Sequence, residues 1–63
     1  MIFDNIKTMC EERGMSISAL ERKAGLGNGT ISGWSESSPR LEKIMAVANV
    51  LGVTIEDLIK KEE

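Results

Sequence analysis

Apolar side chains recur at intervals of three and four residues along most of the chain. Near the N-terminus, Ile2, Ile6 and Met9 follow this spacing, which places them on one face of a helix. Similar apolar faces recur further along. The pattern predicts five helices, over residues 2–13, 16–24, 27–35, 39–51 and 54–61. Because no stretch shows the strict alternation typical of a strand, we expect a compact all-α domain.

Residues with helix-ending preferences support these boundaries. Ser16 is a good N-cap for the second helix, and the run from Thr54 to Asp57 resembles a capping box for the fifth. Ser38 and Pro39 predict the start of the fourth helix, with Ser38 as its cap and Pro39 in the first helical position. Glycines suited to helix ends follow three of the helices, at positions 14, 25 and 52.

Length and composition narrow the class of protein. The chain has 63 residues, and we expect residues 1–63 to form a single domain. The only cysteine, Cys10, cannot form an internal disulfide, and its place on the apolar face of the first helix predicts a small buried hydrophobe. With no histidine in the chain, we expect no metal site. No apolar run approaches the roughly 20 residues of a membrane span, and no leader is evident, so we expect a cytoplasmic protein with no membrane partner.

The charge balance argues against a nucleic-acid partner. Ten acidic and eight basic residues give a net charge of −2, and the isoelectric point is about 5.1. Phosphate binding normally depends on an excess of lysine and arginine.

The stretch from residue 16 to residue 34 carries the most information. Two short helices flank Ala24-Gly25-Leu26, where Gly25 permits a left-handed turn and Leu26 fills the angle between the helices. The spacing directs Leu20, Ile31 and Trp34 into one shared core, and a core position for Trp34 is favoured over base stacking. The second helix of this pair then has its other face exposed.

This arrangement resembles the Cro/repressor-type helix-turn-helix family, the XRE-like group of bacterial and phage regulators. The resemblance runs from about residue 6 to residue 58. It includes the Ser16 cap, the Thr-Ile-Ser core at 30–32, the Pro-x-Leu-Glu-x-Ile opening at 39–44 and the closing Leu-Gly-Val-Thr-Ile-Glu-Asp-Leu at 51–58. It implies the five-helix DNA-binding domain of phage repressors, with the helix-turn-helix formed by the second and third helices, and a bacterial or phage-encoded origin.

One departure from the family concerns Glu21. Family members often have alanine in the middle of the first motif helix, where this chain has a glutamate. A carboxylate there would lie close to the third helix. We therefore expect Glu21 either to lean outward or to find a partner.

The resemblance implies a set of DNA-contacting residues, because the third helix of such domains enters the major groove. The base-reading positions are Gly27, Asn28, Gly29, Thr30, Ser32 and Gly33. The backbone-contacting positions are Ser16, Ser18, Ser37, Ser38, Arg40 and Lys43. Asn28 can pair with the N6 and N7 atoms of an adenine, and the Thr30 methyl can lie against a thymine methyl.

Domains of this size usually bind DNA as dimers, which predicts a homodimer on a pseudo-palindromic operator. The fifth helix and the turn before it offer Val53, Ile55 and Ile59 as candidate dimer contacts.

These features lead to one hypothesis and one alternative. The hypothesis is a Cro-like transcriptional regulator, a repressor, that reads double-stranded DNA with its third helix. The alternative is a helix-turn-helix protein-interaction module, antitoxin-like or an assembly partner, that has lost DNA binding; the acidic charge balance favours it. The sequence has no paired nucleophile and base, no ligand cluster and no phosphate loop, so we expect no enzymatic activity, no cofactor and no small-molecule effector.

Overall fold

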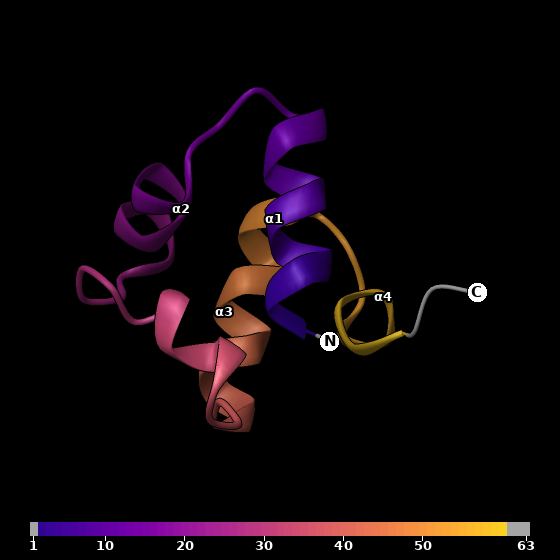
Figure 1. The fold of residues 1–63 in the computed structure, drawn as a ribbon. Helices are drawn as coiled ribbons and strands as arrows, with labels where there is room; N and C mark the ends of the chain where they lie inside the picture. Colours follow the sequence, from indigo (N-terminus) through magenta and orange to yellow (C-terminus); the bar gives the residue numbers. More distant parts are fainter. Residues whose placement is uncertain (1, 61–63) are drawn as a thin grey trace.

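The helices of this protein are short, and they follow one another with little intervening chain (Figure 1). A computed structural model describes residues 2–60. It contains α1 (Ile2–Glu12), α2 (Ile17–Ala24), a 3-10 helix η1 (Ser32–Ser35), α3 (Leu41–Leu51) and α4 (Ile55–Ile59). No strand occurs within this part of the chain. In Figure 1, α2 and the loop after it lie on one side of α1 and α3, and α4 lies on the other.

Several of the predicted helix ends are present. The Ser16 hydroxyl oxygen accepts a hydrogen bond from the Ala19 N–H at 3.0 Å and caps α2. At the other end of α2, Gly25 has a φ of 74°, a left-handed conformation that glycine adopts readily. Thr54 and Asp57 form a reciprocal capping box at the start of α4.

The core joins all of the elements. Its fully buried side chains include Ile6 from α1, Leu20 from α2, Ile31 from the turn before η1, Val47 from α3 and Leu58 from α4. α2 packs on α3, while α1 packs on both η1 and α4.

Trp34 belongs to the same cluster and is only 7% exposed, which confirms its predicted core position beside Leu20 and Ile31. Cys10 is also buried in this core, as its spacing predicted.

The prediction of an α-helix over 27–35 is wrong. Residues 28–31 form turns, and only Ser32–Ser35 is helical, as a 3-10 helix. Gly29 has a φ of 85°, which no regular right-handed helix contains. The described chain therefore has four α-helices and one 3-10 helix in place of five α-helices.

The fourth predicted helix also begins later than expected. α3 starts at Leu41 and its N-cap is Arg40, so Pro39 precedes the helix instead of occupying its first turn. Arg40 is in an extended conformation, and its carbonyl accepts the N–H groups of Lys43 and Ile44. The last residue of the predicted fifth helix, 61, lies outside the described residues.

The beginning and end of the described chain are joined by one side chain. The Asn5 amide donates hydrogen bonds to the carbonyl oxygens of Leu58 at 2.6 Å and Lys60 at 2.7 Å. This contact ties the first turn of α1 to the last turn of α4. Within residues 2–60, no helix is long and apolar enough to cross a membrane.

Burial of Cys10 gives the stability of the protein a pH dependence that can be tested. Burial raises the pKa of the Cys10 thiol, and the Arg13 guanidinium offsets part of that effect. Because the folded thiol holds its proton more tightly than the unfolded one, its contribution to stability is full below about pH 8.5 and decreases at higher pH. Urea denaturation should therefore show that the free energy of unfolding falls less between pH 7 and pH 10 for Cys10→Ala than for the native chain. An equal decline in both proteins would contradict this prediction.

Candidate nucleic-acid interface

The angle between α2 and the segment that follows is fixed by backbone hydrogen bonds. After the left-handed Gly25, the Leu26 N–H donates to the Glu21 carbonyl at 2.8 Å. This is the Schellman-type ending that turns the chain sharply out of a helix. Leu26 is half-buried and packs against the core. α2 and the segment that follows it are thereby held as one unit.

The predicted base-reading residues lie together in the stretch that follows Leu26 and in the first half of η1, and most of them are exposed. The exposed residues of this set are Gly27, Asn28, Gly29, Ser32 and Gly33, and Thr30 is half-buried. Ile31 and Trp34 point the opposite way, into the core. The segment 27–33, which we call the reading segment, therefore has an anchored side and a polar side open to solvent.

The carboxylate of Glu21 supports the reading segment from beneath. Glu21 is only 2% exposed, although it is an acidic residue. One of its oxygens accepts the Gly29 N–H at 3.2 Å, and the other accepts the Ile31 N–H at 2.9 Å. Of the two expectations for this residue, the structure shows that it finds a partner, namely the backbone of the reading segment. A buried carboxylate with both oxygens bonded is stable where an isolated one would not be.

The loop after η1 is tied to the reading segment through one carbonyl group. The Gly33 carbonyl accepts the N–H groups of Glu36 and Ser37, both at 3.1 Å, and the Ser37 hydroxyl at 3.2 Å. Of the predicted phosphate-contacting residues in and after this loop, Ser37, Ser38 and Arg40 are exposed, whereas Lys43 is half-buried. The role of this carbonyl could not be predicted from the sequence, because every residue carries a main-chain acceptor and the residue type does not show which one is used.

The remaining predicted phosphate contacts lie at the start of α2. Ser16 and Ser18 are both exposed there. The Ser16 oxygen accepts the capping bond, and its own hydrogen can still be donated to a phosphate oxygen. The first-turn N–H groups of a helix have no acceptor within the helix and favour an anion. The start of α2 and the loop before α3 thus both carry exposed groups that can donate hydrogen bonds to an anion.

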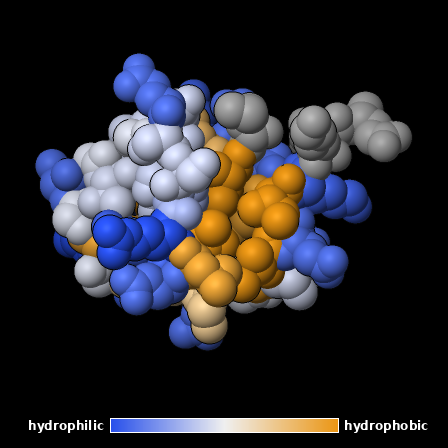
Figure 2. Space-filling view, turned by 90° about the horizontal axis from the view of Figure 1, so that it is seen from below, coloured by the Kyte–Doolittle hydropathy of each residue, from blue (hydrophilic) through white to orange (hydrophobic). Residues whose placement is uncertain are grey.

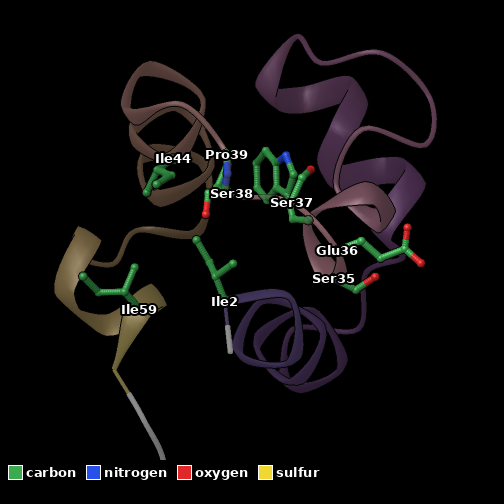
Figure 3. Close-up of a pocket in the computed structure, with 9 residues that line it drawn as sticks. Ile2, Ser35, Glu36, Ser37, Ser38, Pro39, Ile44 and Ile59 are labelled. Atoms are coloured by element: carbon green, nitrogen blue, oxygen red, sulfur yellow. The ribbon is translucent and has the colours of Figure 1, made fainter.

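Among the described residues, the three predicted dimer contacts line two different hollows. Half-buried Val53 and Ile55 line a shallow hollow together with Met45 of α3. Ile59 lines a different groove of about 430 Å³, where it faces Ile2 and Ile44 (Figure 3).

An apolar surface occupies part of the underside of the molecule, beside a more polar region (Figure 2). Among residues 2–60, the large apolar side chains exposed over more than half of their surface are Leu41, Met45 and Ile59.

The relationship of the chain to known proteins agrees with this geometry. Residues 5–63 match the sequence profile of the Cro/C1-type HTH DNA-binding domain. The chain belongs to this family. Cro/C1-type domains are DNA-binding regulator domains and typically have no enzymatic activity.

A solved structure supports the same assignment. The N-terminal DNA-binding domain of SinR from Bacillus subtilis is 29% identical to this chain, and the two structures superpose with a TM-score of 0.89. The alignment covers 100% of this Cro/C1-type chain and 96% of the SinR domain. Comparison with curated proteins finds no match. The family match and the similarity to the SinR domain point to double-stranded DNA as the partner of this Cro/C1-type domain.

The role of Glu21 can be tested by its effect on stability. Glu21→Ala leaves the buried Ile31 N–H without an acceptor, and we expect the free energy of unfolding to fall by about 2–3 kcal/mol. Glu21→Gln keeps one acceptor oxygen and should lose roughly half as much. Urea denaturation measures both. Glu11→Ala, at an exposed position on α1, is the control and should change little. Equal stability of all three variants would show that the carboxylate does not support the reading segment.

Proposed function

We propose that this chain is a Cro-like transcriptional repressor that binds a specific operator and places its reading segment in the major groove. The observation that carries the proposal is the reading segment itself, which is polar and exposed on one side and anchored by Ile31 and Trp34 on the other. A groove-reading element needs this combination, since the polar side must meet base edges while the rest stays fixed to the domain.

Asn28 is the candidate for direct base readout. It is exposed; its side-chain NH2 group can donate a hydrogen bond to N7 of an adenine while its amide oxygen accepts one from the N6 amino group of the same base. The neighbouring positions 27, 29 and 33 are glycines, which offer no side-chain hydrogen bonds. Direct readout therefore rests on few groups, with Thr30 and Ser32 beside Asn28.

Phosphate contacts fix the register of the reading segment on the duplex. Ser38 and Arg40 lie on the loop that the Gly33 carbonyl holds, and Ser16 and Ser18 lie at the start of α2. Ser37, which was also predicted to contact phosphate, donates both its N–H and its hydroxyl to that carbonyl and positions the loop instead. Because the chain has a net charge of −2 and Glu36 lies in the same loop, few counterions are released on binding. We infer an affinity that depends only weakly on salt.

A protein bound at a promoter represses transcription by blocking access to it. One domain of this size covers one half-site of an operator. Two copies on a pseudo-palindromic operator would read two major grooves about one helical turn apart. We infer a homodimer that acts in the cytoplasm of a bacterium, whether its gene is bacterial or carried by a phage.

A second candidate function is a module that binds another protein in place of DNA. The net charge and the exposed apolar side chains of Leu41, Met45 and Ile59 favour it. The two functions predict opposite results when the chain is offered random DNA.

Selection from random duplex DNA at low salt, with two variants, tests the proposed function. Asn28→Ala should lose preference at one base position, with a loss of about 1–3 kcal/mol for the preferred site. Arg40→Ala should weaken binding to all sequences equally and reduce the salt slope by about 1. If the native chain enriches no site, the protein-interaction function replaces DNA reading.

The homodimer can be tested separately through Ile59, which is 53% exposed. Ile59→Lys should weaken binding to a two-half-site operator about tenfold, because an apolar contact between copies is lost. Binding to a single half-site should not change. Leu41→Lys is the matched control, since it adds the same charge at a residue that is 61% exposed and outside the predicted dimer contacts. Equal weakening by both variants would argue against Ile59 as a dimer contact.

A further inference from the structure

Gly33 is a glycine that the fold does not require. Its backbone is outside the left-handed region, which among the described glycines is adopted at positions 14, 25, 29 and 52. A Cβ atom added at Gly33 would meet nothing within 4 Å. Glycine in a helical position also destabilises the helix relative to alanine. Neither backbone conformation nor packing within the domain therefore explains why this position lacks a side chain.

The contrast with Gly29 is direct, because both glycines belong to the reading segment. Gly29 has a φ of 85°, a conformation in which an alanine would be strained whatever the available space. Its glycine is explained by the turn that it makes. Gly33 has no comparable explanation inside the molecule, so the constraint must come from outside it.

The backbone at Gly33 is both exposed and rigid. Its N–H donates to the Gly29 carbonyl at 3.3 Å, and its own carbonyl accepts three hydrogen bonds from Glu36 and Ser37. The next residue, Trp34, is buried in the core. No side chain at position 33 covers this stretch of main chain, and the surrounding bonds prevent it from moving aside.

We propose that Gly33 is the point at which the protein backbone makes its closest contact with DNA, so that its missing side chain sets the depth of the reading segment in the groove. This proposal rests on the proposed function. Glycine is the residue that lets a backbone approach a ligand within van der Waals distance. A methyl group at this position would hold the DNA away by about the length of one carbon–carbon bond, roughly 1.5 Å.

That displacement would be felt by the whole interface. Asn28 on the reading segment follows directly before Gly29, and Ser38 on the adjoining loop follows directly after Ser37; Gly29 and Ser37 are both hydrogen-bonded to Gly33. Moving the DNA outward at position 33 lengthens the hydrogen bonds that these residues make, and such bonds weaken steeply with distance and angle. Gly33 thus determines affinity without forming a hydrogen bond of its own to a base.

The experiment compares Gly33→Ala and Gly33→Leu with the native chain on the operator that the native chain selects. Urea denaturation should show that Gly33→Ala is at least as stable as the native chain. Fluorescence anisotropy should show its Kd raised about tenfold, the equivalent of one lost base contact, with a larger rise for Gly33→Leu. Gly29→Ala is the matched control within the same segment, and it should lose stability, because its φ suits glycine alone.

The possible failures are distinguishable. If the native chain selects no operator, the proposed function fails and this proposal fails with it. If the native chain selects an operator and both Gly33 variants bind it with native affinity, only the close contact at Gly33 is refuted. A marked loss of stability in Gly33→Ala would also refute it, because the glycine would then serve the fold.

Discussion

The arrangement of the reading segment depends on the carboxylate of Glu21. A turn containing a left-handed Gly29 cannot form the regular hydrogen bonds of a helix, so its N–H groups need acceptors from elsewhere. Glu21 supplies two, at Gly29 and Ile31, from a buried position on α2. The same contacts satisfy both oxygens of a carboxylate that would otherwise be costly to bury. Neither partner would be stable in its place without the other.

The hydrogen bonds of Glu21 to the reading segment also determine where the neighbouring residues lie. Fixing Ile31 places its side chain in the core beside Leu20 and Trp34. Trp34 in turn anchors η1, and the Gly33 carbonyl within η1 holds the loop that carries Ser37. The polar side of the segment is thereby left exposed as a fixed surface, although only two of its residues, Ser32 and Gly33, are helical.

The sequence predicted the elements that depend on local patterns. The capping residues Ser16 and Thr54 and the left-handed Gly25 mark the ends of α2 and α4 because caps act over three or four residues. The core positions of Leu20, Ile31 and Trp34 followed from helical spacing, and the resemblance pointed to a family that the profile match confirms.

The interactions that could not be predicted join residues through backbone geometry. The spacing of Ile31 and Trp34 fits an α-helix and a 3-10 helix equally well, so the α-helix predicted over 27–35 failed at Gly29. The acceptors on Glu21 and Gly33 depend on how the turn folds, which residue types alone do not specify. The contact of Asn5 with the end of α4 spans 53 residues and has no local signal. The roles of individual residues toward DNA remain proposals, because they concern a molecule outside the chain.

The bond from Asn5 to the Leu58 carbonyl has a consequence for the order in which this protein can assemble. α1 packs on α4, whose Leu58 is completely buried, so the packing of α1 is complete only once α4 has folded against it. Until then one wall of the shared core is missing, and the reading segment, which lies on the other side of α1 and α3, lacks part of its support.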